Sequence, residues 1–169
     1  DKKGIIKEKK CFNRLIIYDK ITRRMKMIDQ IYAGSSPLSW SADSKNIICQ
    51  TSDGKIAVCD LGNNVLVSDK GKYPICHPIT GQIYYIAPDS HLYKISLDGK
   101  KRFKVDDSDW SWASLIDFSK DGNNLFFIGG GSFLMSEYST ISVFSLTSHK
   151  KETLSKKYGI IQGASLFED

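Results

Sequence analysis

Acidic and aromatic side chains stand next to one another in the segment VDDSDWSW, residues 105–112. Carboxylates at this density could bind calcium. Calcium loops, however, alternate oxygen ligands and end on a bidentate Glu, and this segment has neither feature. Asp and Ser are also ordinary turn residues. Two interpretations stay open: a polar link between strands, or a surface patch for a partner protein or a sugar. In the second case the contacts would be Asp106, Asp107, Asp109, Trp110 and Trp112.

In a second segment, GGGSFLMSEY at residues 129–138, a run of glycines is followed by large apolar and aromatic residues. A phosphate cradle would need a helix N-terminus directly after the glycines, but the following residues are typical of loop and strand. Aromatic residues and Met are enriched at protein interfaces. We therefore predict that this segment anchors a partner protein, and the alternative is that it packs against a neighbouring structural unit. The predicted contacts are Phe133, Leu134, Met135, Glu137 and Tyr138.

The remaining reactive side chains do not form a recognisable catalytic or metal-binding pattern. His77, His91 and His149 have no carboxylate or Cys at metal-ligand spacing. The chain also lacks the GxSxG turn that would present a nucleophilic serine. We therefore predict no catalytic residues, no metal site and no cofactor.

Four cysteines, at positions 11, 49, 59 and 76, occur without a CxxC pair. If Asp53-Gly54 forms a two-residue turn, Cys49 lies opposite Val58 and Cys59 points to the other face of the sheet. We interpret all four cysteines as small apolar strand residues, which favours a reducing compartment.

The elements that would position these residues are strands. Short β-branched and aromatic segments alternate with Gly, Asn, Asp and Ser clusters about every 8–12 residues, as in sandwiches, barrels and propellers. No window keeps an apolar helical period long enough to predict a helix. The expected strands are Arg14–Asp19, Arg24–Ile28, Leu38–Ser41, Ile47–Thr51, Lys55–Asp60, Val65–Ser68, Tyr73–His77, Gln82–Ala87, His91–Leu97, Arg102–Val105, Ala113–Phe118, Leu125–Gly129, Thr140–Ser145 and Ile160–Ser165.

The strands fall into a repeat. Three units, beginning near residues 37, 73 and 112, each run strand, turn, apolar strand, turn, alternating strand, turn and short strand. A half unit precedes them, and GIIQGASLFED at the end matches the opening strand of another unit. Equivalent positions Asp19, Asp60, Ser96 and Ser145 are 41, 36 and 49 residues apart, and the 129–138 insertion explains the longest spacing. A period near ~40 with four strands per unit is typical of propeller blades.

We therefore predict an all-β fold of the β-propeller type, with about four four-stranded blade units. The ring could close if the first and last strands share a fourth blade. The alternative is an open arc, which leaves sheet edges exposed.

The segment WSADSKNIICQTSDGKIAVCDL, residues 40–61, resembles the TolB-like repeat: an aromatic residue, Ser-Pro-Asp-Gly-Lys, an apolar strand, and a strand ending in Asp-Leu. FSKDGNNLFFIGG repeats the pattern, and His77 occupies the position of Trp40 and Phe118. Ala42 and Ser44 replace the usual Pro and Gly. The resemblance spans residues 12–166 and implies a TolB-like, WD-repeat-like propeller that works by binding other proteins.

The charge is concentrated at the start of the chain. Residues 1–26 hold ten Lys or Arg against three acids, whereas the whole chain has a net charge of +5. Residues 1–11 are interpreted as a basic N-terminal arm and residues 12–169 as the repeat domain. The arm has few aromatic residues for base stacking, so we do not expect a nucleic-acid partner. No apolar run reaches the ~18–20 residues that span a bilayer.

We predict a non-catalytic domain that binds another protein. The first alternative is a small cytoplasmic inhibitor of the immunity type that blocks a toxin. The second is an accessory domain of a propeller-type hydrolase or lyase. The cysteines favour the cytoplasm, and the resemblance leaves the bacterial periplasm as the alternative.

Overall fold

The computed structural model describes residues 13–33, 38–60, 62, 65–130 and 139–155. Within these ranges the regular structure is entirely β, and the strands form one two-stranded and three four-stranded antiparallel sheets. The strands are β1 (Asn13–Asp19), β2 (Arg24–Ala33), β3 (Ser39–Trp40), β4 (Asn46–Gln50), β5 (Lys55–Asp60), β6 (Val65–Lys70), β7 (Lys72–Cys76), β8 (Ile83–Ile86), β9 (Leu92–Ile95), β10 (Arg102–Asp106), β11 (Ser114–Phe118), β12 (Asn124–Gly129), β13 (Thr140–Ser145) and β14 (Lys151–Thr153).

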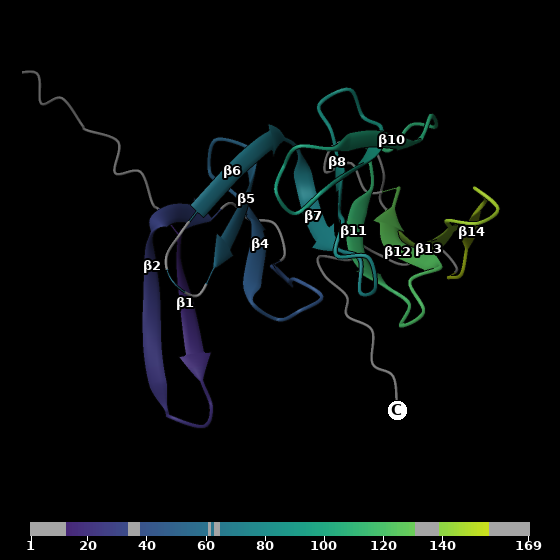
Figure 1. Ribbon diagram of the computed structural model, residues 1–169. Coiled ribbons are helices and arrows are strands. Elements are labelled where there is room, and N and C mark those ends of the chain that lie inside the picture. Colours follow the sequence, from purple (N-terminus) through teal and green to yellow (C-terminus); the bar gives the residue numbers. More distant parts are fainter. Residues whose placement is uncertain (1–12, 34–37, 61, 63–64, 131–138, 156–169) are drawn as a thin grey trace, which may run out of the picture.

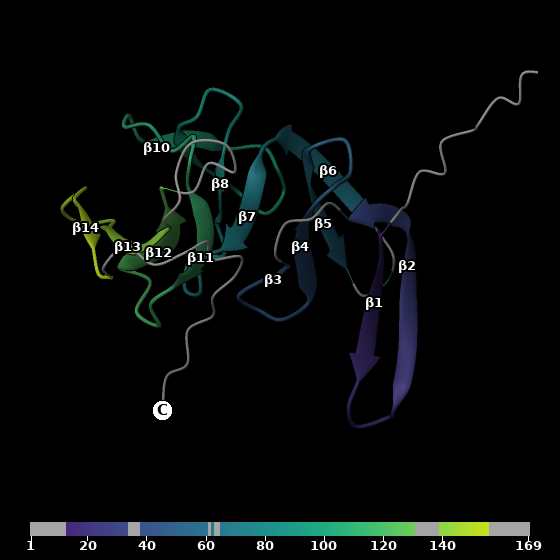
Figure 2. The ribbon, with the colours of Figure 1, turned by 180° about the vertical axis from the view of Figure 1, so that it is seen from behind.

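Each four-stranded sheet is a meander of consecutive strands, β3 to β6, β7 to β10 and β11 to β14. The sheets stand side by side in an open arc with the β1–β2 hairpin at one end and β14 at the other (Figure 1). The reverse view in Figure 2 shows the same order. The predicted propeller-type blades are therefore confirmed, including the middle unit, and the described blades form an open arc.

Every expected strand up to Thr140–Ser145 overlaps an observed strand. The expected strand Ile160–Ser165 and the arm of residues 1–11 lie outside the described residues.

Among the described residues, three apolar clusters hold the sheets together, one at each junction. The largest joins the second and third blades through Tyr84, Trp110, Phe127 and Phe144. Another joins the first and second blades, and the smallest lies on the first blade under Ile17 of the hairpin. The first and second blades therefore each pack on a neighbour through both faces.

The same hydrogen-bonded turn closes strand pairs throughout the arc. A Ser or Thr hydroxyl donates to the Asp carboxylate two residues later and accepts a backbone N–H at the end of the turn. The hydroxyl–carboxylate pairs are Ser41–Asp43 (2.6 Å), Thr51–Asp53 (2.5 Å), Ser96–Asp98 (2.5 Å) and Ser119–Asp121 (2.6 Å). The Ser hydroxyls hold the pKa of Asp43, Asp98 and Asp121 below the usual value. These acids are turn formers, as the repeat predicts.

The cysteine register differs from the sequence expectation. Cys49 pairs with Ala57, and Ile48 lies opposite Val58. The reason is that Thr51 N donates to Lys55 O, so the turn spans three residues rather than two. Cys49 and Cys59 consequently share one face and one apolar cluster instead of pointing to opposite faces. Cys49, Cys59 and Cys76 are free and buried, as expected of apolar strand residues, and Cys11 lies outside the described residues.

Candidate partner-binding face

The innermost strands β3, β7 and β11 lie next to one another and divide the surface into two ends. We call the end at which β7 and β11 begin the upper face. It is formed by turn residues 50–54 and 87–90, the interblade links 70–72 and 106–113, and residues 129, 130, 139 and 140. At the opposite, lower face β3 and β11 end at Trp40 and Phe118, and His77 directly follows the end of β7.

The link between the second and third blades contains the predicted acid and aromatic residues. Trp110 is 1% exposed, and its ring packs on Phe127 and edge-on to Phe144 at centroid distances of 4.8 and 5.3 Å. Its Nε1 donates to Asp106 Oδ2 at 2.7 Å. Trp110 therefore anchors the link in the core and supports the surface from below.

Two lysines from other strands hold the link from the sides. Lys151 Nζ of β14 lies 3.8 Å from the Trp110 ring centroid and 3.8 Å from Asp106 Oδ2, and donates to Asp109 O at 3.2 Å. Lys72 Nζ of β7 donates to Ser111 O at 3.0 Å. The link is thus fixed by contacts from two blades before any partner arrives.

The surroundings of the link shift the pKa values of two of its acids, Asp106 and Asp109, and of Lys151, which contacts both. Burial alone would raise the pKa of Asp106, but hydrogen bonds from Ser108 and Trp110 and the charge of Lys151 outweigh it, so the net shift is downward. Burial lowers the pKa of Lys151, and Asp106 and Asp109 oppose that shift. The N–H and hydroxyl of Ser111 lower the pKa of Asp109.

On this fixed link, Trp112 is 59% exposed. Asp107 is exposed and forms an ion pair with Lys104 at 3.0 Å, and Asp109 is also exposed. The surface side chains of the predicted patch are therefore Asp107, Asp109 and Trp112, whereas Trp110 and Asp106 lie beneath them.

A cavity of about 290 Å³ connects the two predicted segments. Asp109, Trp110 and Trp112 line one side, and Gly129, Gly130 and Thr140 line the other. These last residues flank the 131–138 segment. Phe133, Leu134, Met135, Glu137 and Tyr138 themselves lie outside the described residues, so their predicted contacts stay a prediction. The structure nevertheless places Gly130 and Thr140, which stand on either side of this segment, at the cavity that borders Trp112.

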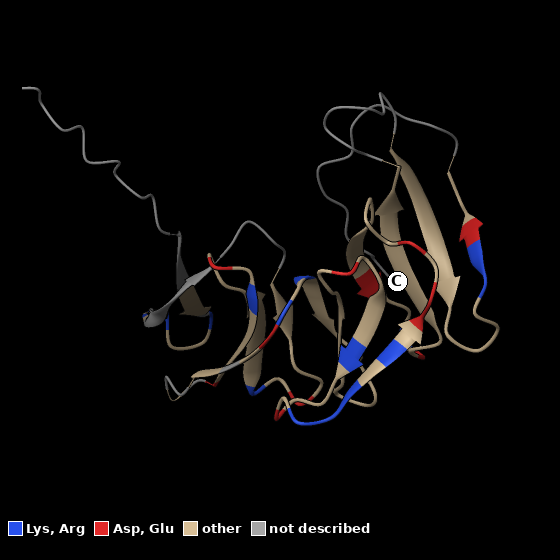
Figure 3. Ribbon diagram, turned by 90° about the horizontal axis from the view of Figure 1, so that it is seen from above, with Lys and Arg blue, Asp and Glu red and all other residues tan. Residues whose placement is uncertain are grey.

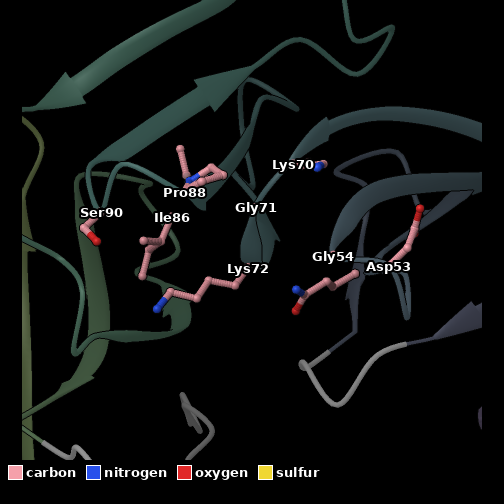
Figure 4. A pocket seen from close by; sticks show the side chains of 10 residues that line it. Asp53, Gly54, Lys70, Gly71, Lys72, Ile86, Pro88 and Ser90 are labelled. Carbon is pink, nitrogen blue, oxygen red and sulfur yellow. The ribbon is translucent and has the colours of Figure 1, made fainter.

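A second cavity of about 330 Å³ opens on the same face, between the first and second blades (Figure 4). It is lined by Lys70, Lys72, Pro88 and Ser90 among others. Gly71 allows the backbone at this cavity to pass close to the Tyr85 ring, since a Cβ at residue 71 would lie 2.3 Å from Tyr85 Cδ2. Sequence reasoning did not predict this cavity or the role of Lys72 and Lys151, because these lysines look like ordinary strand-end charges. The signal available was the Gly71-Lys72 break between two strands.

The lower face has a cavity of about 450 Å³, but repeated turn segments line it, including Ser41–Asp43 and Ile79–Gln82. His77 lies at this end and is buried. Its Nδ1 accepts hydrogen bonds from the N–H groups of Ile79 and Thr80 at 3.2 Å each, and its ring packs tilted against Phe118 at a centroid distance of 4.9 Å. It is thus a structural strand-end residue, as its place in the repeat predicts.

Across the described residues, no three His, Cys, Asp or Glu side chains are grouped to hold a metal ion. Positive and negative residues alternate along the described arc rather than gathering on one side (Figure 3). In the part of the chain that the structure describes, no helix has the length and apolar character needed to cross a membrane.

No protein-family model matches this sequence, and no curated protein matches it either. Solved structures do match its fold. TolB from Acinetobacter baumannii is similar over 85% of this chain and 37% of its own, with 17% identity and a TM-score of 0.66. A chain of a Nidogen/Laminin complex matches over 85% of this chain and 57% of its own, with 14% identity and a TM-score of 0.66. The Swd1 β-propeller domain of Myceliophteria thermophila matches over 86% and 50%, with 11% identity and a TM-score of 0.55.

This chain therefore spans less than two thirds of each of these matched chains. The repeated turns, the four-stranded meanders and these matches agree. The chain has an all-β fold of the TolB-like, WD-repeat-like propeller type.

Proposed function

We propose that this protein is a non-catalytic scaffold that binds another protein through its upper face. The observation that carries the proposal is the position of Trp112, which is exposed on a rigidly held link and borders the same cavity as Gly130 and Thr140, the residues on either side of the predicted partner-binding segment. A large aromatic side chain held in place contributes contact area with little loss of conformational entropy on binding. The partner would meet Trp112 flanked by Asp107 and Asp109.

The matched folds support a scaffold role in a general way. One matched chain belongs to a complex of nidogen and laminin. Rigid blades present loops, and binding residues are often on loops that a rigid scaffold positions. The inhibitor of the immunity type and the hydrolase or lyase accessory domain stay predictions without a specific supporting observation.

Affinity capture from native lysate tests the proposal with two matched variants. Trp112→Ala removes the exposed tryptophan of the upper face, and Trp40→Ala removes one of similar exposure, 51% against 59%, at the lower face. We expect a stoichiometric partner to be recovered with the parent chain and with Trp40→Ala, and to be lost with Trp112→Ala. Equal recovery with both variants would contradict the proposed surface.

A further inference from the structure

Two of the buried cysteines lie side by side on one face of the first blade. In the β4–β5 pairing, Cys49 is opposite Ala57 and Cys59 is opposite Ile47, so the two cysteines occupy diagonal positions on the same face of the sheet. Both are 0% exposed and both are free thiols. Their side chains are within hydrogen-bonding reach of each other. A disulfide between these two thiols therefore requires no change in the register of the strands.

The contact makes the two thiols chemically unequal. The hydrogen bond from Cys59 lowers the pKa of Cys49, although burial alone would raise it. The thiolate, and not the thiol, is the reactive form of cysteine. The pair thus has a nucleophilic position, Cys49, and a second position, Cys59, whose thiol lies ready to react with whatever forms on the first sulfur.

The pair is covered by the β1–β2 hairpin, which lies beside the first blade at the end of the arc (Figure 1). Cys49 and Cys59 belong to the apolar cluster on which Ile17 of β1 and Val65 of β6 pack, both partly buried. β1 and β2 form a separate two-stranded sheet. A two-stranded hairpin is only marginally stable by itself, and thinly packed elements open locally at the lowest cost. Lifting of the hairpin would bring a small solute to the thiols while the blade stays folded.

Cys76 shows that burial in a strand does not by itself bring two thiols together. It is free and buried like the pair, but it lies in the cluster between the first and second blades. Its thiol donates to the backbone oxygen of His77 at a distance of 3.7 Å. Burial raises the pKa of Cys76, which keeps it in the unreactive thiol form. Cys76 is therefore a matched internal control for the pair.

We propose that Cys49 and Cys59 are a reversible redox pair that a peroxide oxidises to a disulfide. The Cys49 thiolate attacks one oxygen of hydrogen peroxide, the O–O bond breaks, and the departing hydroxide takes the proton released by the Cys49 thiol to form water. The Cys49 sulfenic acid then condenses with Cys59. The S–S bond forms, and the sulfenic hydroxyl leaves with the Cys59 proton as a second water. Two electrons pass from the two sulfurs to the peroxide oxygens.

The disulfide would link β4 and β5, the two central strands of the first blade. A covalent link between neighbouring strands restricts the conformations that the opened blade can adopt. Disulfides that form in reducing compartments are usually transient and sense the redox state. The pair would accordingly close under oxidising conditions and reopen when a thiol reductant is present.

Peptide mapping by mass spectrometry, after treatment of the folded chain with hydrogen peroxide, tests the proposal. Every chain carries Cys11→Ser, so that the three cysteines of the described strands are the thiols present. We expect the peptides with Cys49 and Cys59 to become linked with loss of two hydrogen atoms, and dithiothreitol to reverse the link. Cys76 should remain available for alkylation after unfolding. Ile17→Ala should speed the reaction about fivefold, because it removes part of the apolar contact that holds the hairpin on the pair.

Single substitutions separate the two roles. In Cys59→Ala the sulfenic acid on Cys49 should persist and be labelled by dimedone, whereas Cys49→Ala should leave Cys59 unlabelled. Equal labelling in the two variants would overturn the assigned roles. No linked peptide in the folded parent chain, linkage only after unfolding in urea, or equal oxidation of Cys76 would each overturn the redox pair. These last three comparisons keep all three strand cysteines, so they do not depend on the folding of the alanine variants.

Discussion

Gly122 is the position where one methyl group tests the packing between the second and third blades most sharply. Gly122 has a φ of 72°, and a Cβ built there would lie 2.3 Å from Cε1 and 2.6 Å from Nε2 of His77. Gly81, in the equivalent turn of the second blade, has a φ of 67° and no atom within 4 Å of such a Cβ. The two glycines share the backbone conformation and differ in the contact.

Replacing either glycine by alanine adds the same backbone term. An L-residue in the left-handed region costs roughly 1–2 kcal/mol, and the smaller freedom of alanine in the unfolded chain offsets about 0.5–1 kcal/mol of it. Gly81→Ala should therefore destabilise the fold by about 0.5–1 kcal/mol. Gly122→Ala must in addition displace His77, which two backbone N–H groups and the Phe118 ring hold in place. Overpacking of this kind costs about 1–3 kcal/mol, so Gly122→Ala should exceed Gly81→Ala by that amount.

Urea unfolding followed by circular dichroism measures both variants, and unchanged m-values would show that the unfolded states are comparable. Repeating both substitutions in a His77→Ala background completes a double-mutant cycle. There the additional cost of Gly122→Ala should disappear, because its steric partner is absent. Equal costs for the two glycines in the parent chain, or an excess that survives without His77, would refute the described packing of the blades.

Two further predictions concern the same turns. Ser44 has a φ of 57°, whereas the equivalent positions of the other two units hold glycines of positive φ, Gly81 and Gly122. Ser44→Gly should therefore stabilise the fold by roughly 0.5–1 kcal/mol in urea unfolding, and a lower unfolding midpoint would contradict this. Burial lowers the pKa of His77 below its usual 6.5, so the unfolded chain binds more protons just below that pH. Stability should consequently fall as pH drops below about 6.5, and His77→Phe should flatten this part of the stability–pH curve; an unaltered slope would exclude His77 as its source.

The blades could be predicted because their turn chemistry is local. Each Ser or Thr hydroxyl donates a hydrogen bond to an Asp two residues away, so a short sequence pattern indicates the unit wherever it recurs. The cysteine register could not be predicted with the same security, since it depends on whether Thr51 pairs with Lys55. One such pair shifts the strand by one residue and moves Cys59 to the face of Cys49.

Part of the candidate site could also be predicted from a short stretch of sequence. The segment from Asp106 to Trp112 stood out by composition, but the division between buried Trp110 and exposed Trp112 depends on Phe127 and Phe144 from the next blade. The contribution of Lys151 depends on a contact with Asp109 across 42 residues of sequence. Such long-range contacts leave no periodic signal. Whether the blades form a ring or an arc depends likewise on the packing between sheets.

The measurement that tests the central claim most directly is the comparison of Trp112→Ala with Trp40→Ala in quantitative affinity capture. If the upper face binds a partner, Trp112→Ala loses the protein that the parent chain and Trp40→Ala both retain, while all three chains show the same circular dichroism spectrum. Equal recovery of that protein by both variants, or its loss with Trp40→Ala alone, would contradict the proposed binding face.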